Sequence, residues 1–223
     1  MMKRNFCLYF LILLLSSKES VSQVVQPFAE EIETFRKADS LAFPPAGSIL
    51  LVGSSSFTMW KDVDAYFPGR TIVNRAFGGS TLEDLIRYRY QVLFPYQPKQ
   101  IVMYCGENDF AASDTVSVAT VFGRFQTLFQ LIRARYPSVP FLYVSMKPSP
   151  SRKHLMGRFE EANHLIGSYL KQYRRTVFAD VYHAMLQTDG SPMADIYVED
   201  QLHMNAKGYA IWKQILVKYL VKN

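Results

Sequence analysis

Five short apolar segments rich in β-branched residues alternate with longer amphipathic segments along this sequence. Each apolar run is nearly continuous in hydrophobicity, which is typical of strands buried on both faces of a sheet. The predicted strands cover 48–53, 71–77, 100–106, 140–146 and 176–182. Helical periodicity predicts helices over 28–41, 81–93, 115–136, 151–173 and 206–221. Because such helices are long enough to cross over between parallel strands, the sequence predicts a three-layer α/β/α sandwich. It is flavodoxin-like in outline, with a five-stranded, mostly parallel sheet.

Polar and glycine-rich clusters follow the predicted strands, at the points where each strand ends. Residues 54–56 follow the first strand, 78–79 the second, 106–109 the third and 147–152 the fourth. In open parallel sheets the ligand crevice lies beyond the carboxyl ends of the strands. We therefore expect the first three clusters to meet at one edge of the sheet, with residues 147–152 forming a rim of the crevice.

The N-terminal residues predict an export signal. A short basic start precedes ten apolar residues, 6–15, and a polar stretch follows. Ten residues are too few to span a bilayer but suit the core of a signal peptide. Small residues at Ser20 and Ser22 predict cleavage after Ser22, with an uncleaved anchor as the alternative. We expect a signal peptide over 1–22, one domain over 23–223, and a periplasmic or secreted protein without stable membrane insertion after cleavage.

Charge and metal-ligand spacing narrow the possible partners. Removing the signal takes away three basic residues and one acidic residue, so the net charge of +6 falls to +4. No basic run is present, and nucleic acid is therefore not an expected partner. Cys105 alone remains, which excludes an internal disulfide. No His/Cys cluster has zinc spacing, and the acidic residues between 189 and 200 lack the spacing of a calcium loop. We expect no metal and no cofactor.

Three consecutive serines, 54–56, follow the first predicted strand. A serine hydroxyl is a weak nucleophile until a base takes its proton and donors stabilise the oxyanion, and each of these serines could instead cap or fill a turn. The α/β-hydrolase pattern Gly-x-Ser-x-Gly does not fit, because Phe57 holds the last glycine position. A nucleophilic serine therefore needs a histidine, a carboxylate and donors from other segments.

Four segments supply these groups together. They are VGSSSF (52–57), NRAFGGST (74–81), CGENDF (105–110) and EDQLHMNAKGY (199–209). In order and content they resemble the SGNH hydrolases, also called GDSL-type esterases and lipases, and the resemblance spans about residues 48–210. It implies a carboxylic ester hydrolase that acts through an acyl-enzyme.

Carried over residue by residue, the resemblance implies that Ser55 is the nucleophile, with His203 as the base and Asp200 as the carboxylate. It also implies an oxyanion hole built from the backbone N–H groups of Ser55 and Gly79 and the side-chain amide of Asn108. These residue types suit the chemistry. Asp200 would hold the Nδ1–H of His203 and leave Nε2 for the serine proton. Gly79 allows a close backbone approach, and Asn108 is a neutral donor.

Two positions depart from the family pattern. Ser54 stands where the family has the Asp of Gly-Asp-Ser, and Ala76 stands where the second segment often has the Gly of Asn-x-Gly. The Gly-Ser-Ser-Ser form recurs as a variant within the family. The resemblance therefore places the chain in a divergent branch, in which the hydrogen bonding beside the nucleophile differs.

The substrate is less constrained than the chemistry. Phe57, Phe110, His183 and Tyr197 flank the motifs or the predicted crevice and could shape a substrate pocket, although each aromatic residue fits a core position equally well. The export signal and the absence of a long apolar lid favour short acyl esters, above all O-acetyl groups on carbohydrate. A small-molecule or glycan ester is the expected partner. A lysophospholipase or thioesterase, and a non-catalytic carbohydrate-binding protein, are the alternatives, and the sequence leaves the oligomeric state open.

Overall fold

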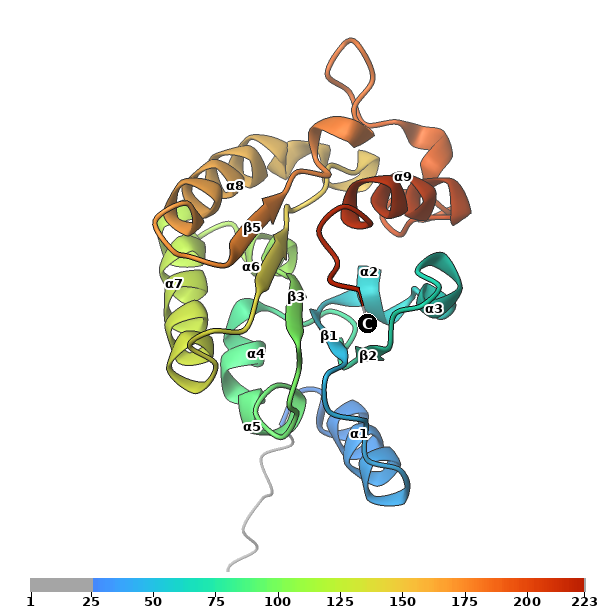
Figure 1. Ribbon diagram of the computed structural model, residues 1–223. Coiled ribbons are helices and arrows are strands. Elements are labelled where there is room, and N and C mark those ends of the chain that lie inside the picture. The colour runs from blue at the N-terminus through green and yellow to red at the C-terminus, as the bar shows by residue number, and fades with distance from the viewer. Residues whose placement is uncertain (1–25, 223) are drawn as a thin grey trace, which may run out of the picture.

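The computed structural model describes residues 26–222, so the predicted signal peptide over 1–22 lies outside the described residues. Five strands form one sheet in the order β2-β1-β3-β4-β5 (Figure 1). The strands are β1 (Ile49–Gly53), β2 (Ile72–Asn74), β3 (Gln100–Tyr104), β4 (Phe141–Val144) and β5 (Thr176–Ala179). Every pairing among them is parallel. This order is the flavodoxin-like one, and the predicted fold class is confirmed.

The central strand β1 shows why the apolar runs are continuous. It pairs with β2 and β3 in register, so that Ile49 lies opposite Ile72 on one side and Gln100 on the other. Its side chains alternate between two separate cores, with Leu50 in one and Leu51 in the other. A strand that has helices on both faces needs apolar residues at every position, not at every second one.

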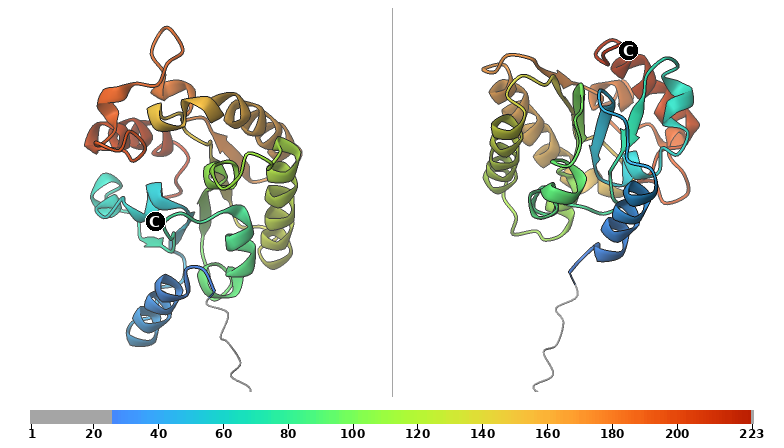
Figure 2. Two further views of the ribbon diagram at one scale, coloured as in Figure 1. Left: turned by 180° about the vertical axis from the view of Figure 1, so that it is seen from behind. Right: turned by 60° about the horizontal axis from the view of Figure 1, so that its bottom comes forward.

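Helices cover both faces of the sheet (Figures 1 and 2). On one face lie α4 (Leu82–Arg87), α5 (Arg89–Val92), α7 (Val118–Arg135) and α8 (Met156–Leu170). On the other face lie α2 (Ser55–Thr58), α3 (Val63–Tyr66) and α9 (Ala206–Leu216). The remaining elements are α1 (Ala29–Leu41), α6 (Glu107–Ala111) and three 3₁₀ segments, η1 (Pro150–Leu155), η2 (His183–Met185) and η3 (Ala194–Ile196). No helix between residues 26 and 222 is both long and apolar enough to cross a bilayer.

Two predicted helices are interrupted. The helix expected over 81–93 is divided at Tyr88, where the backbone leaves helical geometry (φ −93°, ψ 13°) and the buried side chain donates a hydrogen bond to the Pro27 carbonyl. The helix expected over 151–173 begins as the 3₁₀ segment η1, with a kink at Arg152 (φ −113°, ψ 25°). In both places a tertiary contact of the side chain coincides with the break.

The last helix is shorter than its periodicity predicts. We expected it to extend to residue 221, but α9 ends at Leu216. Beyond it, the N–H groups of Tyr219 and Leu220 still donate to the Leu216 carbonyl, at 2.9 Å and 3.1 Å, and the side chain of Gln100 also holds the segment. Gln100 donates to the Tyr219 carbonyl and accepts from the Val221 N–H, each at 2.9 Å. The Gln100 bonds bring the C-terminal segment to the start of β3.

Candidate active site

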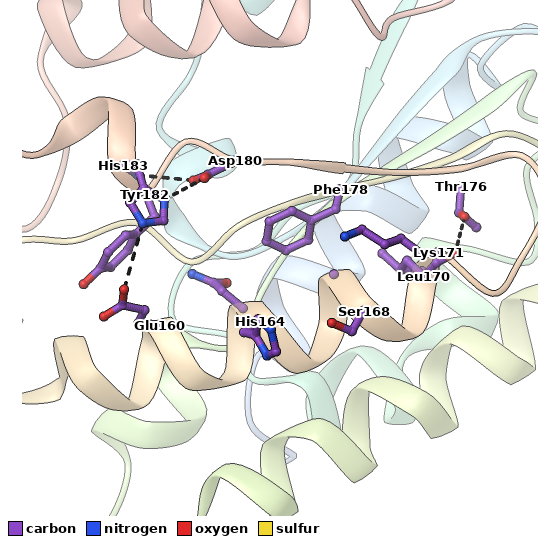
Figure 3. Close-up of a pocket in the computed structure, with 12 residues that line it drawn as sticks. Glu160, His164, Ser168, Leu170, Lys171, Thr176, Phe178, Asp180, Tyr182 and His183 are labelled. Atoms are coloured by element: carbon purple, nitrogen blue, oxygen red, sulfur yellow. Dashed lines mark hydrogen bonds and ion pairs between the residues drawn. The ribbon is translucent and has the colours of Figure 1, made fainter.

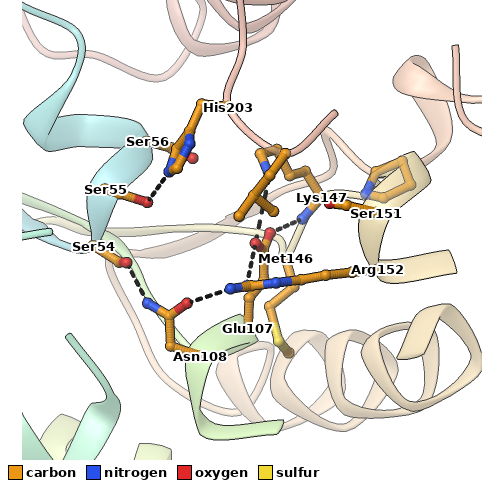
Figure 4. Close-up of polar contacts among 12 residues, drawn as sticks. Ser54, Ser55, Ser56, Glu107, Asn108, Met146, Lys147, Ser151, Arg152 and His203 are labelled. Atoms are coloured by element: carbon orange, nitrogen blue, oxygen red, sulfur yellow. Dashed lines mark hydrogen bonds and ion pairs between the residues drawn. The ribbon is translucent and has the colours of Figure 1, made fainter. Parts of the chain in front are cut away.

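The predicted site residues gather at the carboxyl ends of β1 and β3. In the strand order 2-1-3-4-5, β1 and β3 are the neighbours at which the chain switches direction, and a crevice opens between their carboxyl ends. Ser55 begins α2 directly after β1, and Asn108 lies in α6 directly after β3. The loop before α9 carries His203 to the same place, as Figure 4 shows. Segments far apart in the sequence therefore meet there.

Gly53 makes the turn from β1 into the serine loop possible. Its φ angle is +139°, and a Cβ atom at this position would lie 1.8 Å from the backbone oxygen of Tyr104. A side chain is excluded there because the strand end packs against the backbone of β3. The next residue, Ser54, donates its N–H to that same Tyr104 oxygen at 3.0 Å. This bond fixes the backbone immediately before Ser55.

The three serines have different surroundings. Ser54 is 5% exposed, and its Oγ accepts a hydrogen bond from Asn108 Nδ2 at 2.6 Å. Ser56 is 2% exposed, and its carbonyl accepts from the Tyr209 hydroxyl. Ser55 is half-buried, and its Oγ lies 2.9 Å from Nε2 of His203. Among the three, the middle serine is the one whose hydroxyl faces the histidine.

Asp200 orients the histidine. Its Oδ2 lies 2.5 Å from His203 Nδ1, while its Oδ1 accepts the backbone N–H groups of Leu202 at 2.8 Å and His203 at 2.9 Å. Partial burial acts to raise the pKa of Asp200, but these hydrogen bonds outweigh it and hold the pKa at about 2. The carboxylate is therefore anionic at neutral pH. It holds the proton on Nδ1, which leaves Nε2 free to accept the Ser55 proton.

The loop that carries Asp200 and His203 is held by its own backbone. Val198 N–H donates to the His203 carbonyl at 2.8 Å, and Gln201 occupies the left-handed region with φ 55°. Asn205 then caps α9, because its Oδ1 accepts the N–H of Lys207 at 2.9 Å. The D-x-x-H spacing thus folds into a tight turn that is anchored at a helix N-terminus.

The backbone donors expected for an oxyanion lie on the loops after β1 and β2. Gly79 is exposed and has φ +81°, a conformation that favours glycine. Within residues 26–222, neither the Gly79 N–H nor the Ser55 N–H donates to a protein acceptor. Both groups are therefore available to a ligand. Gly78 has no positive φ, so the backbone distinguishes the two adjacent glycines.

Asn108 is tied to the loop that carries Gly79. Its Nδ2 donates to the Ser80 carbonyl at 3.0 Å as well as to Ser54. The neighbouring Asp109 is fully buried and accepts the Leu82 N–H at 2.9 Å, at the start of α4. Burial raises the pKa of Asp109, against the opposing effects of Leu82 and Arg124. The G-x-N-D segment therefore holds the loops after β2 and β3 together.

A buried charged cluster lies behind Asn108, formed by Glu107 after β3 and by Lys147 and Arg152 from the segment that was expected to be a rim of the crevice. Glu107 accepts hydrogen bonds from the Lys147 backbone N–H at 2.9 Å, from Lys147 Nζ at 3.4 Å and from Arg152 Nη1 at 3.3 Å. Arg152 Nη2 also donates to Asn108 Oδ1 at 2.9 Å (Figure 4). Burial lowers the pKa of Lys147, and the Glu107 charge opposes this effect. The sequence contained only a weak indication of this cluster. Glu107 follows the third predicted strand, and Lys147 and Arg152 are the two ends of KPSPSR (147–152), which follows the fourth.

Three of the four aromatic or histidine residues expected to contact substrate lie in the interior. Phe57 is fully buried against Trp212, with ring centroids 5.8 Å apart. Phe110 is buried in the opposite core. Tyr197 is buried, and its hydroxyl donates to the Pro148 carbonyl. The prediction that Phe57, Phe110 and Tyr197 shape the substrate pocket is therefore wrong. Each follows or precedes a motif, but its side chain packs inward.

His183, the fourth of these residues, lies on the surface between α8 and β5. It borders a hollow of about 420 Å³ whose lining includes Phe178, Asp180 and Glu160 but none of Ser55, Asp200 and His203 (Figure 3). Its Nδ1 lies 2.6 Å from Asp180 Oδ2. The structure does not bring His183 to the triad residues. It forms a second His–Asp pair, in which the other ring nitrogen, Nε2, lies 3.9 Å from Glu160 Oε1.

The other reactive side chains do not assemble a further centre. Within residues 26–222, no three His, Cys, Asp or Glu side chains gather closely enough to hold a metal ion. Cys105 is free and buried, and burial raises the pKa of its thiol. A buried thiol with a raised pKa is a poor nucleophile. Ser55, His203 and Asp200 are therefore the candidate reactive residues of this site.

A comparison with known protein families identifies the chain. The sequence profile of the GDSL-like lipase/acylhydrolase family matches residues 39–211. The chain belongs to this family. The GDSL-like family consists of acylhydrolases and esterases, so the protein is a hydrolase of ester bonds. A comparison with curated protein sequences gives no match.

Solved structures share the fold of this GDSL-like chain. A Streptococcus pneumonia protein described as a candidate platelet activating factor has a TM-score of 0.75 at 21% identity, over 86% of this chain and 92% of its own. A GDSL-like lipase from Bacteroides thetaiotaomicron has a TM-score of 0.69 at 18% identity, over 84% of this chain and 95% of its own. An acetyl xylan esterase from Geobacillus stearothermophilus has a TM-score of 0.62 at 11% identity, over 81% of this chain and 99% of its own.

Proposed function

We propose that this protein is a serine esterase that removes short acyl groups, above all O-acetyl groups, from carbohydrate. Ser55 is the nucleophile, His203 the general base and Asp200 the carboxylate that orients it. One observation carries the proposal: a continuous hydrogen-bonded chain joins Asp200 Oδ2 to His203 Nδ1 at 2.5 Å and His203 Nε2 to Ser55 Oγ at 2.9 Å. These are the distances that proton transfer from a serine requires.

The reaction proceeds in two halves. Ser55 Oγ attacks the ester carbonyl carbon while His203 Nε2 takes the serine proton, which gives a tetrahedral intermediate. The N–H groups of Ser55 and Gly79 and the amide of Asn108 stabilise its oxyanion. His203 then gives the proton to the departing alcohol, and an acyl-enzyme remains on Ser55. Water deprotonated by His203 attacks this ester and releases the acid.

Ser54 determines how readily the side-chain N–H of Asn108 exchanges its resting hydrogen bond for one to the oxyanion. In the resting site one N–H of Asn108 donates to the Ser54 hydroxyl, which is a neutral acceptor. An oxyanion is a stronger acceptor than a hydroxyl, because hydrogen bonds to charged groups are about twice as strong as neutral ones. The family's Asp at this position would be a charged competitor. The serine therefore gives up the Asn108 N–H more easily when the intermediate forms.

Two considerations favour short acyl groups on carbohydrate. Proteins with this fold include the acetyl xylan esterase from Geobacillus stearothermophilus and a carbohydrate esterase family 3 protein from Talaromyces cellulolyticus. Residues 1–22 favour export to the periplasm or medium, where glycans are accessible, and the N-terminal sequence of the exported protein tests this.

A panel of acyl-chain lengths tests the proposal. Wild type and Ser55→Ala are assayed on p-nitrophenyl acetate, butyrate and octanoate, and on acetylated xylan with release of acetate as the readout. Wild type hydrolyses acetate fastest and deacetylates xylan, whereas Ser55→Ala stays at background. Faster hydrolysis of octanoate would indicate a lipid acyl hydrolase instead. No hydrolysis of any ester, with retained binding of xylan, would indicate a carbohydrate-binding protein.

A further inference from the structure

Arg152 links the buried charged cluster to the proposed oxyanion donor. It sits at the kink of η1, and its side chain is 16% exposed. Its guanidinium spans two acceptors, because Nη1 donates to Glu107 Oε2 at 3.3 Å and Nη2 donates to Asn108 Oδ1 at 2.9 Å (Figure 4). The planar fork of arginine suits two acceptors that lie side by side on one helix turn.

The two ends of the Asn108 amide have different partners, and these partners fix its orientation. A guanidinium only donates, so Arg152 must face the amide oxygen. The Ser80 carbonyl only accepts, so it must face the amide nitrogen, which lies 3.0 Å away. A flipped amide would point its N–H₂ at Arg152 and its oxygen at Ser80. Both contacts would then be repulsive, so the nitrogen is held on the Ser54 side of the site.

We propose that Arg152 is a positioning residue that holds and polarises the Asn108 amide, so that its nitrogen is oriented and strengthened as an oxyanion donor. The inference rests on the proposed esterase function and adds a residue to it. A positive charge at the oxygen end of an amide withdraws electrons from the nitrogen end and makes its N–H a better donor. Arg152 itself contacts neither the nucleophile nor the base.

The cluster around Glu107 keeps Arg152 in place. Glu107 is buried and holds Arg152 Nη1 together with both nitrogens of Lys147. The preceding residue, Ser151, donates its N–H at 3.2 Å and its hydroxyl at 3.0 Å to the carbonyl of Gln201. Gln201 lies in the triad loop. The segment from Lys147 to Arg152 therefore bonds to the proposed oxyanion donor on one side and to the Asp200–His203 loop on the other.

A purely structural role for Arg152 predicts different behaviour. Lys147 already places a positive charge on Glu107, so removal of Arg152 leaves that carboxylate paired. A structural role would lower stability and would reduce the apparent kcat only in proportion to the fraction of folded protein, so that kcat per folded molecule would equal that of wild type. A positioning role lowers kcat with little effect on KM, because the oxyanion forms only after substrate binds.

The first test compares Arg152→Met with Lys153→Met. Methionine keeps much of the length of arginine and lacks its donors, and Lys153 is the exposed neighbour, whose replacement removes the same charge from the same segment. Arg152→Met lowers kcat for p-nitrophenyl acetate by about 10- to 100-fold, less than the loss expected from removing a donor outright. Lys153→Met stays within about twofold of wild type. Thermal unfolding of both variants verifies the fold. A kcat of Arg152→Met within about twofold of wild type would overturn the proposal.

A double-mutant cycle with Asn108→Ala decides whether Arg152 acts through the amide. Asn108→Ala alone lowers kcat by about 10²–10³-fold. If Arg152 acts through Asn108, then adding Arg152→Met to Asn108→Ala lowers kcat by less than about threefold. Losses that multiply would show that Arg152 acts by another route, and the proposal would fail.

A readout that needs no activity separates this inference from the proposed function. The side-chain amide of Asn108 is identified in the NMR spectrum by its absence in Asn108→Ala. In Arg152→Met its resonances shift and its protons exchange faster with water, whereas in Lys153→Met they stay as in wild type. Unchanged resonances in Arg152→Met would refute the positioning role. Absence of any Ser55-dependent hydrolysis by wild type would instead refute the proposed esterase, whatever the amide shows.

Discussion

Replacing Asp200 by asparagine prevents His203 from acting as a base without changing the shape of the site, because the two carboxylate oxygens have different partners. Oδ1 accepts two backbone N–H groups, from Leu202 and His203, while Oδ2 faces His203 Nδ1. In Asp200→Asn the carbonyl oxygen must stay with the two backbone donors. The amide nitrogen then faces Nδ1, which must accept, so the ring proton moves to Nε2. Nε2 points at Ser55 and can no longer take its proton.

The size of the expected fall in kcat follows from the loss of the tautomer that has its proton on Nδ1. In a serine protease the equivalent change lowers kcat by about 10⁴-fold, which corresponds to about 5.4 kcal/mol in the barrier. The side chain of Asp200 is 46% exposed, so water takes over part of the stabilisation of the imidazolium. We therefore expect kcat to fall by about 10³-fold in Asp200→Asn. KM stays within about threefold of wild type, because the carboxylate does not contact the substrate.

The chain contains a matched control for this substitution. Asp180 and His183 have the same D-x-x-H spacing, an Nδ1 to Oδ2 distance of 2.6 Å and a 45% exposed carboxylate, but His183 Nε2 lies toward Glu160 Oε1, at 3.9 Å. Initial rates of p-nitrophenyl acetate hydrolysis are measured for Asp200→Asn and Asp180→Asn at equal concentrations of folded protein. Asp180→Asn stays close to wild type. A loss below about tenfold in Asp200→Asn, or an equal loss in both variants, would refute the assigned role of Asp200.

Three further outcomes follow from the same geometry. Asn108→Asp replaces the donor facing the Ser80 carbonyl by an acceptor, so kcat falls by about 10²–10³-fold or more in steady-state assays, and an unchanged kcat would remove Asn108 from the oxyanion hole. Because the pKa of Asp200 is lowered to about 2, this group stays ionised above about pH 4. A plot of log kcat/KM against pH therefore rises with a slope of one on its acid side above about pH 4. A slope of two would show that Asp200 titrates together with His203. Gly53→Ala places a Cβ 1.8 Å from a backbone oxygen and lowers the free energy of unfolding in urea by about 3 kcal/mol or more, whereas a loss below about 1 kcal/mol would contradict the packing of β1 on β3.

The fold was predictable from the sequence because its strands are buried on both faces. Continuous apolar runs and intervening amphipathic helices specify a parallel sheet, and the family resemblance agrees with the strand order found. The interruptions were not predictable. The break at Tyr88 coincides with a hydrogen bond to Pro27, and the end of α9 at Leu216 coincides with bonds made by Gln100. These partners are distant in sequence, so local periodicity contains no trace of them.

The residues of the proposed triad could be predicted from the sequence because each of them lies in a short motif. The structure places Ser55 against His203, and His203 against Asp200, through the turn that the D-x-x-H spacing allows. The prediction that aromatic residues contact the substrate was wrong for a physical reason. A Phe next to a strand end faces either the crevice or the core, and the sequence does not say which, so Phe57 and Phe110 were misplaced.

The cluster behind Asn108 was hidden from the sequence for a related reason. Glu107 begins α6 after β3, whereas Lys147 and Arg152 belong to the segment after β4, and their separation depends on how β3 and β4 lie side by side in the sheet. Charged residues in loops are usually solvated, and no local pattern marks these three as buried. The role proposed for Arg152 therefore comes from the tertiary structure alone.

The assignment of Ser55 as the nucleophile is tested most directly by trapping it. Wild type, Ser54→Ala, Ser55→Ala and Ser56→Ala are treated with a fluorophosphonate, and intact mass and peptide mapping locate the adduct. The assignment predicts one adduct per chain, on Ser55, in wild type and in the Ser54 and Ser56 variants, and none in Ser55→Ala. An adduct that persists in Ser55→Ala, or maps to Ser54 or Ser56 in wild type, would contradict it.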